Sequence, residues 1–230
     1  MYRAFGFDLD NTLYDQAQHL YPFFAEAGVW LHRRTGISAR EAEESFLRTW
    51  RCRTMSYPFL FDDALRSLGL WRSDWIRELV DHYRCFHPPL RLFEDVRPML
   101  ERLSRDHSLF LITDGHSALQ RYKVDELKLS EYFDVLWYTG DYDTSWRKPA
   151  PNLFLRAAML LDVPAPSCLF VGDNPERDVA GARLAGMAAA RVLSGPFRNR
   201  PCEWQVDMVL DRASHLDEVL EAIIPVPVLS

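Results

Sequence analysis

Apolar residues are spaced in two different ways along the chain, and the spacing divides it into two parts. From about residue 94 onward, short apolar runs alternate with amphipathic segments, which is the pattern of a parallel sheet with helices on both faces. The apolar runs predict strands at 109–113, 133–138, 168–172, 187–192 and 208–210. The intervening segments predict helices at 94–104, 117–127, 152–161, 178–185 and 214–224. A further run at 4–7 predicts one strand near the N-terminus.

The segment between about residues 14 and 93 has no clear strand-like run. Its apolar residues recur at helical spacing, in 20–31, 42–50, 58–68 and 74–86. We therefore expect an all-helical domain, residues 15–93, inserted into a core domain made of residues 1–14 and 94–230. The predicted fold class is α/β, with a three-layer, Rossmann-like parallel sheet core and an inserted helical domain.

Composition narrows the possible functions further. The 230 residues carry a formal net charge of -6 with no basic stripe, so we expect no nucleic-acid partner. No apolar run reaches the length of a membrane span, and the first strand begins too early to leave room for a signal peptide. The four cysteines lie far apart without metal-type spacing, which favours free thiols and a cytoplasmic location. A monomer or a homodimer is expected.

Two carboxylates, Asp8 and Asp10, directly follow the first apolar run. If that run is a strand, both point to one face while Leu9 points to the other. They then lie at the carboxyl end of the strand, where open α/β sheets bind their ligands. Two like charges so close are costly unless a cation or a proton intervenes, which indicates a Mg2+ site and leaves one carboxylate for covalent chemistry. Taken alone, the pair is weak evidence for a metal or catalytic site, because such pairs also lie on solvated turns.

Three later segments strengthen this interpretation. The first is an apolar run that ends at Thr113 and is followed by Asp114 and Gly115. In the second, Lys148 lies just before Pro149 and the start of a helix. The third is another apolar run, which ends in Gly-Asp-Asn-Pro-Glu-Arg-Asp, residues 172–178. The order is a strand-end Asp pair, a strand-end Thr, a Lys and a second strand-end Asp pair. In this order and over essentially the whole chain, the sequence resembles the haloacid dehalogenase (HAD) superfamily of phosphatases and their relatives.

The resemblance implies a role for each of these residues. Asp8 is the expected nucleophile, and Asp10 the acid and base that protonates the leaving group and later activates water. Thr113 and the backbone N–H groups after it, at Asp114 and Gly115, are expected to hold the phosphoryl oxygens. The Asp114 side chain, which takes the place of a more usual Asn, is expected to point away or to cap the next helix.

The resemblance also implies how charge is balanced. Lys148, favoured over its neighbour Arg147, supplies the positive charge. Mg2+ is the implied cofactor, with Asp8, Asp173 and the backbone carbonyl of Asp10 as ligands. Asp178 either binds the metal through water or orients Lys148. Asn174 either binds a metal water or caps the turn.

The expected activity is hydrolysis of a small soluble phosphomonoester, such as a sugar phosphate or a nucleotide, through an aspartyl phosphate. A phosphomutase and a 2-haloacid dehalogenase of the same fold are the alternatives. The inserted helical domain is expected to be a cap that sets substrate choice. Five basic side chains are candidates for contacts to a second charge on the substrate, although surface positions are the more common outcome for such residues: His19, Arg51, Arg53, Arg121 and Lys123.

Overall fold

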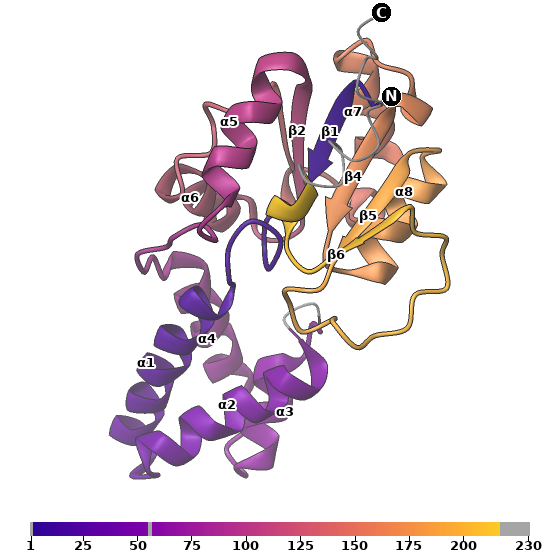
Figure 1. The fold of residues 1–230 in the computed structure, drawn as a ribbon. Coiled ribbons are helices and arrows are strands. Elements are labelled where there is room, and N and C mark those ends of the chain that lie inside the picture. The colour runs from indigo at the N-terminus through magenta and orange to yellow at the C-terminus, as the bar shows by residue number, and fades with distance from the viewer. Residues whose placement is uncertain (1, 55–56, 217–230) are drawn as a thin grey trace, which may run out of the picture. The chain divides into compact units, whose positions relative to one another are not determined.

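Six parallel strands form one sheet, with β1 in the middle of it (Figure 1). The computed structural model describes residues 2–54 and 57–216. The sheet order is β3-β2-β1-β4-β5-β6. The strands are β1 (Ala4–Phe7), β2 (Ser108–Thr113), β3 (Val135–Tyr138), β4 (Cys168–Gly172), β5 (Ala188–Val192) and β6 (Met208–Leu210). This is the order of a doubly wound α/β sheet, and the predicted fold class is confirmed.

The register of the central strands determines which residues lie near one another at the carboxyl ends of β1, β2 and β4. Phe7, the last residue of β1, lies level with Leu111 of β2 and Val171 of β4. The chain therefore leaves all three strands at one edge of the sheet. Since the strand order reverses direction between β1 and β4, that edge is also the position where such sheets open a crevice for ligands.

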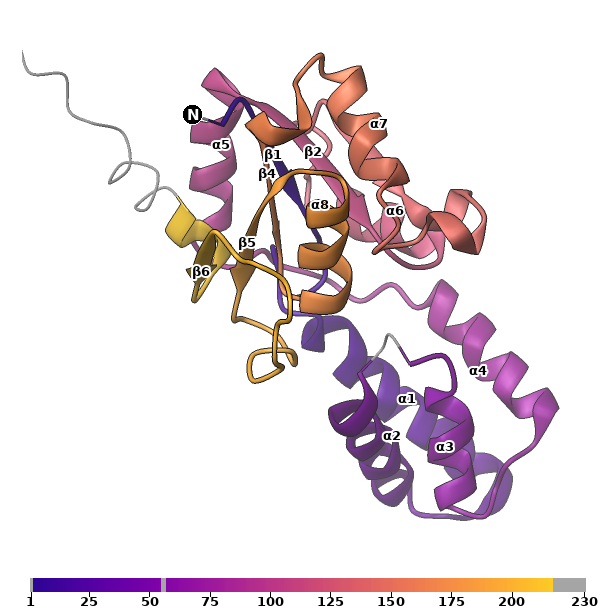
Figure 2. The ribbon, with the colours of Figure 1, turned by 90° about the vertical axis from the view of Figure 1, so that its right-hand side faces the viewer.

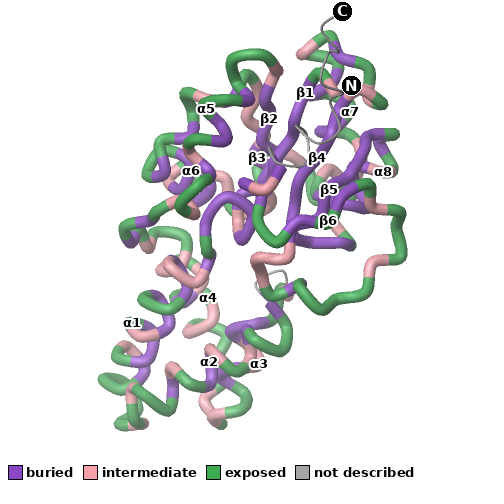
Figure 3. The backbone as a smooth tube through the Cα atoms, viewed as in Figure 1, coloured by how far each residue is buried: buried purple, intermediate pink, exposed green. Residues whose placement is uncertain are grey.

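Helices cover both faces of this sheet. They are α5 (Val96–Asp106), α6 (Ser117–Glu126), α7 (Asn152–Leu160) and α8 (Ala180–Leu184), with short 3-10 turns at Thr139–Asp141, Thr144–Trp146, Ala165–Ser167 and Ala213–His215. Figure 2 shows α5 on the opposite side of the sheet from α7 and α8. The strands β1, β2, β4 and β5 are buried almost throughout because both of their faces are covered (Figure 3).

Three helix predictions need correction. The helix predicted from residue 178 begins earlier, as a wide π-helical turn at Pro175–Val179 that leads into α8. The helix α6 begins without a side-chain cap, although capping it was one of the two roles expected of Asp114. The predicted helix 214–224 overlaps the 3-10 turn Ala213–His215, and its residues beyond 216 lie outside the described part of the chain.

Residues Gln16–Leu90 form a second compact unit, separate from the unit built on the sheet. Its helices are α1 (Ala17–Thr35), α2 (Ala39–Arg53), α3 (Leu60–Ser67) and α4 (Ser73–Cys85). Apolar side chains at helical spacing meet in a core of their own, in which Phe24 and Phe46 stack with ring centroids 5.7 Å apart. Among the described residues, no helix is both long enough and apolar enough to cross a bilayer.

Candidate active site

The side chain of Asp8 lies at the carboxyl end of β1 in contact with a buried lysine. The ammonium of Lys148 is 2.6 Å from Asp8 Oδ1 and 2.7 Å from Asp178 Oδ1, so one cation bridges two carboxylates. The hydroxyl of Thr12 donates to Asp8 Oδ2 at 3.1 Å. Arg147, the neighbouring residue that was the alternative source of the positive charge, is exposed. The structure therefore brings Lys148, and not Arg147, to Asp8.

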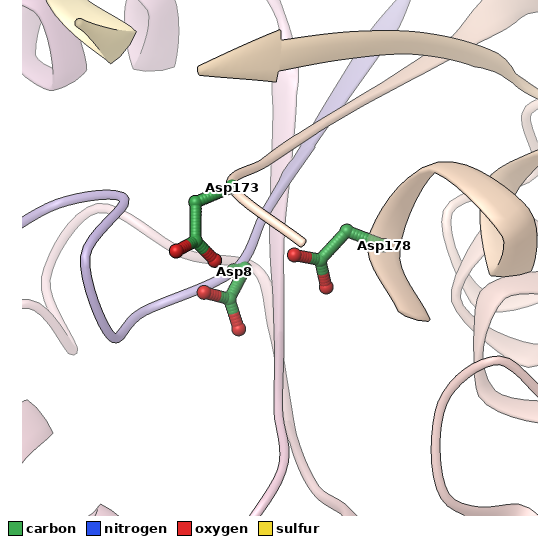
Figure 4. A group of neighbouring side chains, drawn as sticks. All are labelled: Asp8, Asp173 and Asp178. Atoms are coloured by element: carbon green, nitrogen blue, oxygen red, sulfur yellow. The ribbon is translucent and has the colours of Figure 1, made fainter. Parts of the chain in front are cut away.

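Three carboxylates, those of Asp8, Asp173 and Asp178, converge at the ends of β1 and β4 (Figure 4). One oxygen from each lies within 4.8 Å of the others, and all three residues are buried. Asp173 Oδ2 is buried and has no hydrogen-bond partner among the described residues. Because Lys148 supplies one positive charge against three carboxylates, the cluster has an excess of acidic groups.

Burial and mutual repulsion shift the titration of this cluster. Burial, reinforced by the nearby Asp178, raises the pKa of Asp8 to about 7 in spite of Lys148. Burial and then the charges of Asp178 and Asp8 raise the pKa of Asp173 well above its usual range. Burial alone would lower the pKa of Lys148, but Asp178 and Asp8 outweigh it and raise that pKa. The lysine stays charged, and it is one positive charge beside three carboxylates.

These shifts predict a pH-dependent stability for the metal-free chain. The folded state holds a proton on Asp8 that the unfolded chain releases near its ordinary pKa of 3.8, so stability is lost as pH rises through the folded pKa of about 7. We expect the metal-free melting temperature to fall between about pH 5 and about pH 8. The Asp8→Asn variant should show a smaller fall; equal falls in the two proteins would contradict this origin of the effect.

An oxygen-rich cluster with excess negative charge is the donor set that a hard divalent cation prefers. Asp173 Oδ2 also lacks the hydrogen bond that a buried carboxylate normally makes, and a cation there would satisfy it. The residues present therefore fit the Mg2+ ion that the sequence predicted.

The segment after β5 packs directly against Asp173. A Cβ atom built on Gly195 would lie 2.3 Å from Asp173 Oδ2 and 2.7 Å from Asn11 Cβ, so only glycine fits there. The Ser194 hydroxyl donates to the backbone carbonyl of Asn11. The guanidinium of the buried Arg191 holds the loop that follows by donating to the Phe197 carbonyl at 2.6 Å. No motif in the sequence indicates this contact.

Thr113 and Asp114 lie at the end of β2, close to the same edge. The Thr113 hydroxyl donates to Gln120 Oε1 at 3.2 Å. The Asp114 carboxylate accepts from the Lys148 backbone N–H at 3.2 Å and forms an ion pair with Arg177 at 2.7 Å. This side chain therefore does not cap the next helix, which was one of its two expected roles, but binds the segment that carries Lys148.

The wide turn before α8 decides the roles of Asn174 and Asp178. Asn174 Oδ1 accepts from the Glu176 backbone N–H at 3.0 Å, which makes it a cap for the turn. Asp178 Oδ2 accepts from the Asn174 backbone N–H at 2.9 Å, while its other oxygen holds Lys148. Both oxygens of Asp178 are thus engaged by the protein.

Asp10 is held apart from the acidic cluster by a different set of side chains. Lys123 Nζ is 2.7 Å from Asp10 Oδ1, Gln120 Nε2 donates to Asp10 Oδ2 at 3.2 Å, and the Tyr14 hydroxyl also donates to Oδ1. Lys123 was expected at the surface, yet it is completely buried. The only sign of this arrangement in the sequence is a spacing. Gln120 and Lys123 are three residues apart on the helix after Thr113, which places both on one face of it.

The other basic candidates have surroundings of three kinds. Arg51 and Arg53 are exposed. Arg121 forms an ion pair with Asp141 at 2.6 Å. His19 is buried in the helical unit, with Nε2 2.9 Å from the Phe86 carbonyl oxygen.

The fold and this site define an α/β enzyme with an acidic centre at the carboxyl edge of its sheet, and comparison with known proteins agrees. The family model for haloacid dehalogenase-like hydrolases matches residues 2–186. The N-acylneuraminate-9-phosphatase of Rattus norvegicus is 29% identical over 215 residues, which cover 81% of this chain and 80% of that protein.

Two solved structures are similar along nearly their whole length. A HAD phosphatase from Thermococcus onnurineus is 27% identical, with a TM-score of 0.65, and the match covers 95% of this chain and 97% of that one. A 2-haloacid dehalogenase from Pseudomonas syringae pv. Tomato DC3000 is also 27% identical, with a TM-score of 0.60 and coverage of 96% and 99%.

The chain therefore belongs to the haloacid dehalogenase-like hydrolases, and the resemblance seen in the sequence is confirmed. Together with the phosphatase relatives, this membership makes it a phosphoric monoester hydrolase.

Proposed function

We propose that this hydrolase is a Mg2+-dependent phosphatase that acts on a small soluble phosphomonoester through an aspartyl-phosphate intermediate. The observation that carries the proposal is the separation of two neighbouring carboxylates. Asp8 is buried against Lys148 and the acidic cluster, while Asp10, two residues on, is held by its own partners. Two carboxylates in different environments can take two different roles in one reaction.

In this proposal Mg2+ is held by Asp8, Asp173 and the backbone carbonyl of Asp10. When bound, it supplies positive charge for the transferring phosphoryl group. Asp178 holds Lys148 with one carboxylate oxygen and accepts from the Asn174 backbone N–H with the other, so its proposed role is to orient Lys148 toward Asp8.

The chain's own residues perform the transfer in two steps. Asp8 attacks phosphorus, a bond from its oxygen forms, and the bond to the leaving oxygen breaks as Asp10 delivers a proton to that oxygen. Water then attacks the aspartyl phosphate, Asp10 takes its proton, and inorganic phosphate leaves with Asp8 regenerated. Thr113, the backbone N–H groups of Asp114 and Gly115, and Lys148 hold the phosphoryl oxygens.

The helical unit is proposed to be the cap that selects the substrate. The chain enters it after Asp15 and leaves it before Arg91. Tyr14 pairs with both Asp10 and Leu92 through isolated β-bridges. Both connections to the helical unit therefore begin next to the proposed acid. A phosphomutase would keep all the catalytic residues and differ only in the cap.

A dehalogenase is the second candidate, favoured by the similarity to the Pseudomonas enzyme. Its chemistry also uses a strand-end Asp nucleophile, but a halide leaves without a proton and without a metal. The pairing of Asp10 with Lys123 and the unpartnered oxygen of Asp173 support the phosphatase instead. The four free cysteines are in keeping with the further proposal of a cytoplasmic location.

Leaving-group dependence tests the role of Asp10 and separates the two candidates. An alkyl phosphate has a poor leaving group that needs a proton, so Asp10→Asn should slow its single-turnover cleavage by about 100-fold or more. An aryl phosphate loses phenolate more easily, so its first turnover should be slowed much less and should appear as a burst of phenol followed by slow hydrolysis. Equal losses on both substrates would remove Asp10 from the acid role.

A panel of phosphorylated metabolites, assayed with Mg2+ for phosphate release, would identify the substrate class. Halide release from a 2-haloacid, with no phosphate release from any member of the panel, would overturn the proposed function.

A further inference from the structure

Helix α6 presents two polar side chains to the carboxylate of Asp10, and each binds a different oxygen. Lys123 Nζ lies 2.7 Å from Oδ1, and Gln120 Nε2 donates to Oδ2 at 3.2 Å. The two residues are three positions apart, which places them on the same face of the helix. Because both oxygens are bound from one rigid element, the rotation of the carboxylate about its terminal bond is restricted.

Lys123 is completely buried, which is unusual for a lysine. A buried ammonium is costly unless it is paired, and the oxygen at 2.7 Å on Asp10 is its ion-pair partner. Its Nζ is engaged by Asp10, so Lys123 is placed to act on that carboxylate. The two carboxylates that follow β1 thus each have a buried lysine: Lys148 for Asp8, and Lys123 for Asp10.

Gln120 also links Asp10 to Thr113. Its Oε1 accepts from the Thr113 hydroxyl, and its Nε2 donates to Asp10, so the amide has one defined orientation. Gly115 leaves room for this side chain: it has a positive φ of 142°, and a Cβ atom there would lie 2.5 Å from Gln120 Nε2. The absence of a side chain at Gly115 thus makes space for Gln120.

From this geometry we propose that Lys123 and Gln120 are positioning residues that hold the Asp10 carboxylate in the orientation for proton transfer to the leaving oxygen. The proposal rests on the proposed function, in which Asp10 is the acid and base. Neither residue is assigned to the reacting phosphoryl group: Lys123 acts through Asp10, and Gln120 acts through Asp10 and through the Thr113 hydroxyl that donates to it. Their loss should therefore slow the step in which Asp10 transfers a proton to the leaving oxygen, and it should leave the binding site for the phosphoryl group intact.

The test compares Lys123→Met and Gln120→Leu with the wild-type protein on an alkyl phosphate and on an aryl phosphate. In single-turnover measurements with Mg2+, Lys123→Met should slow alkyl phosphate cleavage by about 100-fold and Gln120→Leu by about 10-fold. Aryl phosphate cleavage should fall by less than about 10-fold in Lys123→Met and stay nearly unchanged in Gln120→Leu, and KM should change by no more than about threefold. Lys128→Met is the matched control, because Lys128 is exposed just beyond α6; it should change neither rate.

Binding of BeF3- with Mg2+ gives a readout that does not require turnover. Its affinity should be unchanged in both variants, because Asp8, Lys148 and the acidic cluster remain intact. Equal losses on the two phosphates, together with weaker BeF3- binding, would show that the residues are only structural and would overturn the proposal. An unchanged rate on the alkyl phosphate would overturn it as well.

Two further outcomes are distinguishable. If Lys123→Met does not fold, Gln120→Leu decides, because it removes only neutral hydrogen bonds. If the wild-type protein releases phosphate from neither compound and from no member of the metabolite panel, the proposed function fails and this inference fails with it. If the wild-type protein is active on both phosphates and the variants are weakened equally on both, only the positioning role is refuted.

Discussion

Replacing Asp8 with asparagine is expected to abolish turnover, with a loss on the order of 10⁴-fold or more. The amide is close in size to the carboxylate, but its oxygen is a poor nucleophile and cannot form an acyl phosphate. Stability should not suffer, since the change removes one of three crowded carboxylates and Lys148 keeps its contact with Asp178. Steady-state phosphate release and thermal unfolding together measure the two effects.

The covalent position can be located independently of turnover. BeF3-, a mimic of the phosphoryl group, should form its adduct on Asp8 in the wild-type protein and none in Asp8→Asn. The control is Asp211→Asn, which changes an exposed carboxylate on the same unit. An adduct on any other residue, or an active Asp8→Asn enzyme, would refute the assignment of the nucleophile.

Removal of the metal is the second change with a large expected effect. A chelator should reduce turnover to background, and added Mg2+ should restore it, because the acidic cluster repels a phosphate until a cation neutralises it. Asp173→Asn should raise the Mg2+ concentration for half-maximal activity by about 10- to 100-fold, since Asp173 Oδ2 has no other described partner. Asp211→Asn should leave that concentration unchanged.

Mg2+ should also raise the melting temperature, more at about pH 8 than at about pH 5, because its ligands must lose their protons to bind. Full turnover in the presence of chelator would contradict the metal site. A normal Mg2+ requirement in Asp173→Asn would contradict the ligand assignment.

The sequence predicted the sheet well because buried parallel strands are short continuous apolar runs. β4 was predicted with its observed bounds, and β2 differs by one residue. The meeting of Asp8, Thr113 and Asp173 could also be predicted, since parallel strands all end at one edge of the sheet. The number of helices in the inserted segment followed from apolar periodicity.

Contacts that depend on tertiary packing could not be predicted in the same way. A lysine on an amphipathic helix normally marks the solvent side, so Lys123 gave no sign that it meets a carboxylate 113 residues earlier. The ion pair of Asp114 with Arg177 was not predicted, because Arg177 belongs to the wide turn after β4, which no periodicity indicates. Such contacts become visible only when two strand ends are placed side by side.

The place of β1 in the middle of the sheet has a consequence for how the chain folds. Its partners are distant along the sequence: Ala4 pairs with Ser108 on one side and with Cys168 on the other. By contrast, β2 and β3, or β4 and β5, are joined by short connections and can associate early. During synthesis β1 is made first but must wait, as an unpaired apolar segment, for most of the chain. Because the acidic cluster joins Asp8 to Asp173 and Asp178, the catalytic centre cannot form before the chain through residue 178 has been made.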